Sequence, residues 1–279
     1  MYFTKKLPKI SCLLVTANGR YSLAKKSIEC YLAQTYQNKE LIVVNEGNQS
    51  YQKQLQNFID SLERTDIRTT WLNGVGKYTL GGLRNISIAL ADGDYFVQWD
   101  DDDFCLPQRL SVQYAFLAKN PKAKVCYLSD QLHFFWATSA LYWNNWKKYH
   151  SGNGLTRYSL IPGTGMFARD IPWRYPSHGK NAKAGEDSVF SNQILEDDPS
   201  NIVLLEGMGN MHCYTYHGSQ VYSVEHHMNI ARMRSNDRSF VNKNRERIID
   251  SIKFFDFPGE IKVMCREGIA FIHNGGLNV

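Results

Sequence analysis

The sequence lacks long hydrophobic runs and paired cysteines. None of its 279 residues falls in a stretch that approaches the roughly 20 apolar residues of a membrane-spanning helix. The apolar run 10–15 is too short for a secretory signal. Six scattered cysteines without a CxxC pair favour buried free thiols over disulfides. We therefore expect a cytoplasmic protein, with the inner face of a membrane as the alternative location.

The sequence also has no long block of lysine or arginine. Its formal net charge is +5 and its pI is about 8.8. A mild positive excess suits a nucleotide diphosphate, an acidic membrane surface or a nucleic acid, and it selects none of them. Hydrophobic residues make up 43% and charged residues 21%, which is an ordinary globular balance. The length suffices for one large α/β domain or for a domain with a small appendage.

Short apolar runs alternate with helical patterns in the first half of the chain. We expect strands at 10–16, 40–44, 67–72, 94–99 and 125–132, and helices at 21–33, 51–62, 81–90 and 107–119. Continuous apolar strands separated by helices favour a mostly parallel sheet that is covered on both faces. From about residue 219 the chain is polar, and its clearest helical pattern lies at 236–252.

Four consecutive aspartates, residues 100–103, follow the predicted fourth strand. Adjacent carboxylates repel one another, and such a cluster is usually neutralised by a cation or by hydrogen-bond donors. Carboxylate oxygens suit Mg²⁺ or Mn²⁺, and open α/β sheets bind ligands beyond the carboxyl ends of their strands. The alternative is a solvated acidic turn in which Asp103 caps the helix near Pro107.

Several short segments, in order, resemble family 2 glycosyltransferases, which have the GT-A fold. These segments are ISCLLVT at 10–16, YLAQTY at 31–36, ELIVV at 40–44, LRN at 83–85, 94–107 with its acidic run, PGTGMF at 162–167, GED at 185–187 and HGSQ at 217–220. The resemblance covers about 8–222 and departs at two places. Glu46 stands where the family has an aspartate that meets the nucleotide base, and Gln220 replaces an asparagine.

The resemblance implies a fold and a division of the chain. The fold is α/β and Rossmann-like, with a mostly parallel central sheet flanked by helices. A GT-A catalytic domain is expected at 1–218, with a nucleotide-sugar half at about 1–105 and an acceptor half at about 106–218. A short C-terminal helical extension is expected at 219–279.

The resemblance assigns the acidic run to a metal and a diphosphate. Asp102 matches the residue that binds the metal directly, and Asp100 matches the first acid of the D-x-D pattern. Asp101 matches a residue that meets the ribose or the water shell of the metal. His217 is a further candidate ligand of the metal or the diphosphate, with an ordinary surface or core histidine as the alternative. The implied cofactor is Mn²⁺ or Mg²⁺.

The same resemblance places Thr16, Glu46 and Arg84 around the base and ribose, and adds Asn18 from the loop after the first strand. The charge of Arg84 also suits a phosphate. Its alternative role is an exposed helix arginine. The longer carboxylate of Glu46 can still accept a hydrogen bond from a uracil N–H.

Asp187 matches the general base that deprotonates the acceptor hydroxyl, and Glu186 orients the acceptor or shares that role. The alternative is helix capping, because acids in a first turn favour the helix dipole. The histidines 212, 226 and 227 match no zinc pattern. The aromatic segment 134–146 has three readings: core, acceptor-sugar platform, or an interfacial patch on a membrane.

The expected function is transfer of a sugar from a nucleotide-diphospho sugar, UDP-linked, to an acceptor hydroxyl with inversion. The product belongs to a polysaccharide, a lipopolysaccharide or a glycoconjugate. The expected partners are the donor, a glycan or glycoconjugate acceptor and a membrane surface contacted peripherally, and no nucleic acid. Two alternatives stay open, a metal-dependent nucleotidyltransferase and a non-catalytic nucleotide-sugar or glycan-binding module. The loop 16–20 has one glycine and one arginine, which argues against the nucleotidyltransferase.

Overall fold

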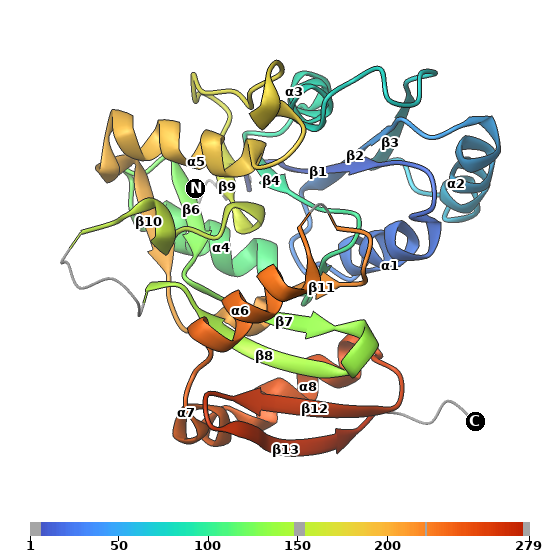
Figure 1. Cartoon of the computed structure of the whole chain (residues 1–279). Coiled ribbons are helices and arrows are strands. Elements are labelled where there is room, and N and C mark those ends of the chain that lie inside the picture. The colour runs from blue at the N-terminus through green and yellow to red at the C-terminus, as the bar shows by residue number, and fades with distance from the viewer. Residues whose placement is uncertain (1–6, 148–153, 221, 276–279) are drawn as a thin grey trace, which may run out of the picture.

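The computed structural model describes residues 7–147, 154–220 and 222–275, and its largest feature is a seven-stranded sheet (Figure 1). The strand order is β10-β6-β9-β4-β1-β2-β3. β1, β2, β3 and β4 run parallel, and only β9 is antiparallel to its neighbours. The strands are β1 Ile10–Thr16, β2 Lys39–Asn45, β3 Ile67–Trp71, β4 Tyr95–Gln98, β6 Val125–Leu128, β9 Met166–Ala168 and β10 Ile202–Leu205. The prediction of a mostly parallel central sheet is confirmed.

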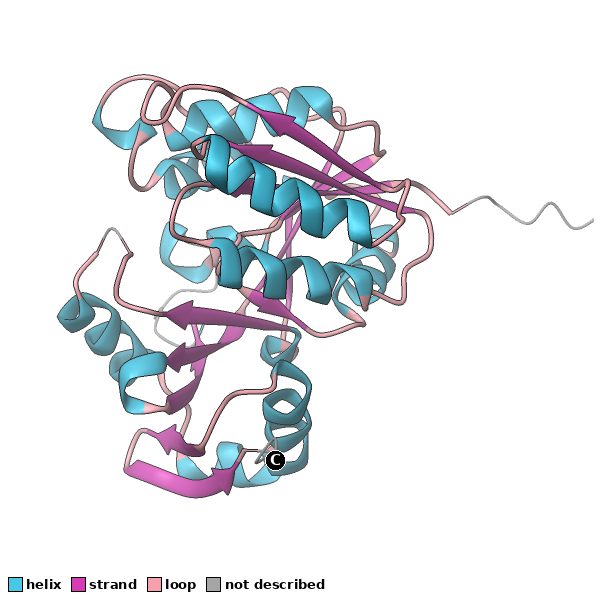
Figure 2. Ribbon diagram, turned by 90° about the vertical axis from the view of Figure 1, so that its right-hand side faces the viewer, coloured by secondary structure: helices cyan, strands magenta, loops and turns pink. Residues whose placement is uncertain are grey.

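Helices cover both faces of this sheet (Figure 2). They are α1 Tyr21–Leu32, α2 Gln49–Ser61, α3 Leu80–Leu90, α4 Arg109–Ala118 and α5 Glu186–Asp197. Successive residues of β1 point to opposite faces, so Leu14 packs with α1, α2 and α4, whereas Leu13 packs with α3 and α5. This two-sided burial explains why the parallel strands are continuously apolar.

A second, six-stranded sheet lies beside the first, in the order β13-β12-β8-β7-β11-β5 (Figure 1). Its strands are β5 Phe104–Cys105, β7 Asp130–Phe135, β8 Ala140–Asn145, β11 His212–Tyr216, β12 Glu260–Cys265 and β13 Gly268–Asn274. The single strand predicted at 125–132 is wrong. The chain leaves the first sheet after Leu128 and enters the second at Asp130, and Ser129 lies between the two. Ser129, Asp130 and Gln131 form a short polar step between two apolar runs, and the chain changes sheet at this step.

The C-terminal residues contain the expected helices, α6 Val224–Arg234, α7 Arg238–Lys243 and α8 Arg245–Phe255. The predicted helix at 236–252 is divided at Asn244. The prediction of a helical C-terminal extension is incomplete, because residues 260–274 form a hairpin of the strands β12 and β13. β12 pairs with β8, and its buried Ile261, Val263 and Cys265 alternate with more exposed residues, a strand period. The boundary at 218/219 stays a prediction, and residues 1–6, 148–153, 221 and 276–279 lie outside the described part.

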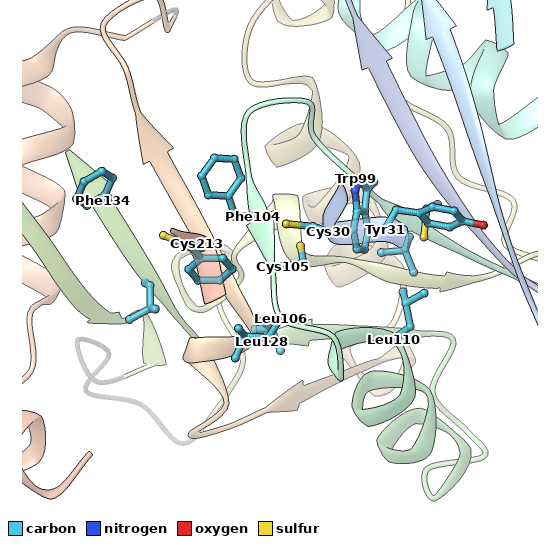
Figure 3. Close-up of a cluster of buried hydrophobic side chains, with 14 of the residues drawn as sticks. Cys30, Tyr31, Trp99, Phe104, Cys105, Leu106, Leu110, Leu128, Phe134 and Cys213 are labelled. Carbon is cyan, nitrogen blue, oxygen red and sulfur yellow. The ribbon is translucent and has the colours of Figure 1, made fainter. Parts of the chain in front are cut away.

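One apolar core joins the two sheets (Figure 3). Trp99 follows β4 of the first sheet, while Phe104, Phe134 and Cys213 belong to β5, β7 and β11 of the second. All six cysteines are buried and free, as the sequence predicts. In the aromatic segment 134–146, most large side chains are core residues, whereas Trp146 lies half-buried at the end of β8.

Across the described residues, no helix combines the length and the apolar character that crossing a bilayer requires.

Candidate active site

A cavity of about 590 Å³ lies where the carboxyl ends of β1, β2 and β4 meet the second sheet. Its wall includes the four aspartates 100–103 and, from the start of α5, Gly185, Glu186 and Asp187. The two acidic groups that the sequence analysis singled out, 85 residues apart along the chain, therefore share one cavity. This is the position where open α/β sheets bind their ligands.

Arg20, in the loop between β1 and α1, balances part of the acidic run. Its Nη1 lies 2.8 Å from Asp101 Oδ1 and 2.7 Å from Asp102 Oδ2. Burial alone raises the pKa of Asp102, but the hydrogen bond with His217 and the charge of Arg20 hold the pKa below its usual value. Burial and the neighbouring Asp102 raise the pKa of Asp101 to about 7, against the lowering effect of Arg20. The run is thus a partly neutralised anionic site.

Asp103 is a buried structural residue, with 3% of its surface exposed. Its Oδ1 accepts a hydrogen bond from the backbone N–H of Thr215 at 3.1 Å, and its Oδ2 lies 3.2 Å from His212 Nε2. The alternative of a solvated turn with Asp103 as helix cap is wrong, because α4 starts at Arg109 and has no side-chain cap. Asp103 instead attaches the acidic run to β11 of the second sheet.

Arg84 on α3 connects the acidic run to the start of α5. Its Nη1 lies 2.8 Å from Asp100 Oδ1 and its Nε lies 2.9 Å from Glu186 Oε1. Arg84 is 8% exposed and Glu186 is 2% exposed. The alternative of an exposed helix arginine is therefore wrong. A planar guanidinium can bridge two carboxylates in this way, and its burial strengthens both ion pairs.

Asp100 is held on its other side by β4 and by a glycine. Gln98 Nε2 donates to Asp100 Oδ2 at 2.9 Å, and Tyr175 O–H donates to Gln98 Oε1 at 3.1 Å. A Cβ atom on Gly163 would lie only 3.2 Å from Asp100 Oδ2. The lack of a side chain at Gly163 thus leaves room for this carboxylate.

Asp187 lies in the first turn of α5, next to Gly185, whose φ of 76° is one that side chains disfavour. Its Oδ1 accepts from the backbone N–H of Ser188 at 2.6 Å, so the helix-start contact is real and coexists with a place in the cavity wall. Burial and the charge of Glu186 raise the pKa of Asp187 to about 6, opposed by Arg84. A carboxylate of raised basicity facing a cavity suits a general base.

The opposite wall carries the residues predicted for the nucleotide. Thr16 Oγ1 lies 2.6 Å from the Tyr51 hydroxyl, and both are buried. Glu46 is 8% exposed, and its Oε1 accepts from the backbone N–H of Tyr78 at 3.1 Å. Thr16 and Glu46 both line the cavity.

Asn18 is placed differently from the other nucleotide candidates. It is exposed, and its Oδ1 accepts from the backbone N–H of Asn48 at 2.8 Å, which ties the loop after β1 to the N-cap residue of α2. Asn18 is absent from the cavity wall. Its contact therefore shapes the loop around the nucleotide wall.

His217, after β11, faces the acidic run. Its Nε2 lies 3.1 Å from Asp102 Oδ2, and its Nδ1 lies 2.9 Å from Ser219 Oγ. Gln220 shapes this loop, because its Oε1 accepts from the backbone N–H groups of His217 and Gly218 at 3.2 and 2.9 Å. The glutamine that replaces the family's asparagine thus holds His217 against Asp102.

These donors fit a divalent cation only in part. A carboxylate oxygen and an imidazole nitrogen that face each other are a ligand pair for Mn²⁺. Arg84 and Gln98 occupy the two oxygens of Asp100, and Arg20 Nη1 likewise lies 2.7 Å from Asp102 Oδ2, the oxygen that faces His217. Within residues 7–147, 154–220 and 222–275, no three His, Cys, Asp or Glu side chains are placed together to hold a metal. Among the described residues, the chain therefore offers Asp102 and His217 as candidate ligands, which is fewer than a complete metal site needs.

The sequence profile of Glycosyl transferase family 2 matches residues 11–168, more than half of the chain. The chain belongs to glycosyl transferase family 2. WcaA of Escherichia coli (strain K12), which carries the name of a colanic acid biosynthesis glycosyl transferase, is 38% identical over 108 residues. That match covers 39% of this chain and 37% of WcaA. The chain spans less than half of the length of the curated relatives it matches.

Solved structures place this family 2 chain in the GT-A fold. S. aureus TarS 1–349, in complex with UDP-GlcNAc, has a TM-score of 0.55 at 16% identity, covering 81% of this chain and 65% of that chain. The mannosyltransferase PcManGT from Pyrobaculum calidifontis, in complex with GDP-Man and Mn²⁺, has a TM-score of 0.56 at 13% identity, covering 88% of this chain and 66% of that one. At these identities the likeness shows the fold alone.

The sequence analysis missed Arg20 as a partner of the acidic run and gave no role to several residues of the second sheet. The contact of Arg20 could have been predicted from the sequence. Arg20 follows β1, Asp101 and Asp102 follow β4, and the carboxyl ends of these parallel strands lie at the same edge of the sheet. His133 and Trp146 also line the cavity. Trp146 belongs to the segment 134–146, for which an acceptor-sugar platform was one of the three expectations, whereas no role was predicted for His133.

Proposed function

We propose that this family 2 chain transfers a sugar from a UDP-sugar to an acceptor hydroxyl, with inversion and with a bound Mn²⁺ or Mg²⁺. One observation carries the proposal: the acidic run and Asp187 line the same cavity at the carboxyl ends of the parallel strands. Family membership and the GT-A fold support the reaction class. The structures of TarS with UDP-GlcNAc and of PcManGT with GDP-Man and Mn²⁺ support a nucleotide-sugar donor and a divalent cation.

The proposed donor side lies between Glu46 and the acidic run. Thr16 and Glu46 contact the base and ribose, and Asp101 lies near the ribose. Asp102 and His217 hold the cation, which when bound stabilises negative charge on the departing diphosphate. Arg20 already contacts Asp101 and Asp102, and its charge favours a phosphate in the same place.

The proposed acceptor side is organised by the start of α5. Asp187 takes the proton from the acceptor hydroxyl while that oxygen attacks the anomeric carbon. Glu186 is held by Arg84, and we assign it to orienting the acceptor side through that ion pair. With one carboxylate base and one leaving group on opposite sides of the anomeric carbon, the reaction is a single displacement, which inverts the anomeric centre.

The test is incubation with UDP-sugars and Mn²⁺, after a thermal-shift screen of nucleotide sugars has identified a ligand. A transferase releases UDP, and proton NMR couplings of the product show the anomeric configuration opposite to that of the donor. Release of pyrophosphate would instead support a nucleotidyltransferase. Retention of configuration would contradict the single displacement. Binding of the UDP-sugar without turnover with any acceptor tested would favour a binding module.

Acceptor classes consistent with the proposal are glycans and glycoconjugates. The relative WcaA carries a name that refers to colanic acid biosynthesis by a glycosyl transferase. We therefore propose polysaccharide, lipopolysaccharide or glycoconjugate synthesis as the setting of the reaction, in the cytoplasm or at the inner face of a membrane.

A further inference from the structure

The cavity continues past Asp187 to a wall built by the second sheet and α6, which Figure 1 shows lying beside β7 and β8. Five residues of this wall each have a buried nitrogen or oxygen atom without a hydrogen-bond partner among the described residues. We call them the polar wall: Gln131 (Oε1), His133 (Nε2), Trp146 (Nε1), His212 (Nδ1) and His227 (Nε2). They come from β7, the end of β8, β11 and α6.

The polar wall costs stability in the ligand-free chain. A buried polar group that lacks a hydrogen bond destabilises the folded state, and native proteins contain few such groups. Several of them gathered on one side of one cavity therefore indicate a place where a ligand supplies the missing partners. Because these atoms are buried in the ligand-free chain, the side chains that cover them have to rotate when the ligand binds.

The groups of the polar wall are uncharged and mixed in kind. The amide oxygen of Gln131 accepts, the indole N–H of Trp146 donates, and a neutral imidazole does either at a given nitrogen. Burial lowers the pKa of His133 to about 3 and the pKa of His227 to about 4, so both rings are neutral at pH 7. Sugar hydroxyls both donate and accept, which matches a neutral wall of this composition.

Aromatic rings flank these polar atoms. The ring of His227 stacks on Tyr214, with centroids 5.4 Å apart, and the ring of His133 stacks on Phe135 at 4.4 Å. The cationic residue beside Trp146 is engaged with the protein, because Arg234 Nη1 donates to Trp146 O and Tyr158 O at 3.2 and 3.1 Å. Among the described residues, the cations that line this cavity are Arg20, Arg84 and Lys183, none of them part of the polar wall, so a phosphate at the polar wall itself would meet neutral groups.

We propose that the polar wall binds the terminal sugar of an uncharged glycan acceptor and presents its hydroxyl to Asp187. The proposal rests on the proposed function, because an acceptor subsite has meaning only beside a donor site. The expected acceptor ends in a neutral sugar ring and not in a phosphate.

The test uses saturation-transfer NMR with methyl β-glycosides of glucose, galactose, mannose and N-acetylglucosamine as probes, beside glucose 1-phosphate and glycerol 3-phosphate. We expect at least one neutral glycoside to bind, and to bind more tightly than either phosphate. Trp146→Phe removes one N–H and keeps a ring, so we expect about a three- to tenfold weaker affinity, the worth of one hydrogen bond. His227→Phe is expected to weaken it by a similar factor.

Trp136→Phe is the matched control. Trp136 Nε1 is also buried without a described partner, but Trp136 packs among Phe104, Phe134 and Phe257, away from the cavity wall. We expect no change in glycoside affinity for this variant. Equal losses for Trp136→Phe and Trp146→Phe would overturn the proposal, as would binding that Trp146→Phe leaves intact, tighter binding of a phosphate probe, or no binding of any neutral glycoside.

Calorimetric titration of the same proteins with UDP and Mn²⁺ separates this proposal from the proposed function. If UDP binds and no neutral glycoside does, only the acceptor proposal fails. If UDP does not bind, the proposed function fails, whatever the glycosides do. Melting temperatures add a second measurement. Trp146→Phe removes an unpaired donor but also part of the ring over which Arg234 Cζ lies, 4.0 Å from the centroid, so we expect a loss of stability no larger than that of Trp136→Phe. A clearly larger loss than in this control would overturn the argument from the unpaired atoms.

Discussion

Arg84 Nε lies 2.9 Å from Glu186 Oε1, and this ion pair between α3 and α5 joins two parts of the site that lie 102 residues apart in the chain. The same guanidinium contacts Asp100 at 2.8 Å. One buried cation thus holds the first aspartate of the acidic run and the acid beside Asp187. Arg84 therefore links the proposed donor side of the cavity to the proposed acceptor side.

Arg84→Met is expected to destabilise the protein by about 3–5 kcal/mol, because it leaves buried carboxylates without their cation. Urea unfolding measures this change. Arg84→Lys keeps the charge without the planar fork, so we expect an intermediate loss. The control is Arg64→Met: Arg64 pairs with Asp66 at the surface, with 47% of its side chain exposed, and we expect a loss of about 1 kcal/mol or less. Equal losses at Arg64 and Arg84 would contradict the buried bridge.

Asp187→Asn is expected to lower turnover by about 10²- to 10⁴-fold, the usual contribution of a general base. Because the pKa of Asp187 is raised to about 6, the wild-type rate of UDP release should rise with pH through about 6 and then level off. Initial rates between pH 5 and 8 check both statements. A wild-type profile without a rise in this range, or a variant with unchanged turnover, would count against Asp187 as the base.

The same substitution should stabilise the fold at pH 7.5. A carboxyl whose folded-state pKa lies above its ordinary value of 3.8 destabilises the folded state when ionised, and asparagine removes this cost. Allowing for solvent screening at a half-buried side chain, we expect a gain of about 1 kcal/mol, or about 2–4 °C in melting temperature. The gain should fall between pH about 6 and pH about 4, where wild-type Asp187 takes up its proton. A gain that does not change with pH would point to another cause.

Asp102→Asn is expected to remove Mn²⁺-dependent UDP binding, because Asp102 faces His217 at 3.1 Å as the proposed metal pair. Calorimetric titration with UDP, with and without Mn²⁺, measures the effect, and we expect at least about a tenfold loss, or about 1.4 kcal/mol. Asp170→Asn is the control, since Asp170 pairs only with Lys124 at an exposed position. Unchanged affinity of the Asp102 variant with Mn²⁺ would remove the metal assignment.

Glu46→Ala is expected to weaken UDP binding more than Mn²⁺ binding, because Glu46 is the proposed contact of the nucleotide and Asp102 the proposed ligand of the metal. Glu46 Oε1 also accepts from Tyr78 N–H, so the substitution can act by loosening that loop. Glu46→Gln separates the two effects, since its amide oxygen can still accept from Tyr78. If Glu46→Gln binds UDP as weakly as Glu46→Ala, the carboxylate itself meets the nucleotide. Equal loss of UDP and Mn²⁺ binding would contradict its assigned place.

Local patterns in the sequence determined the first sheet and much of the candidate site. Strands buried on both faces are continuously apolar, so β1, β2 and β4 were predictable, and the acidic run could be placed because it directly follows β4. The resemblance to the family added Asp187 and His217. Those positions follow from residue order along the chain, which a sequence carries by itself.

Only the tertiary structure decided which groups neutralise one another and where the second sheet lies. Arg20 and Arg84 reach the aspartates across 82 and 16 residues, and no periodicity encodes such contacts. The change of sheet at Ser129 and the pairing of β12 with β8 are likewise long-range choices. The role of a buried charge or polar atom depends on its neighbours in space, because desolvation and hydrogen bonding depend on distance and not on sequence separation.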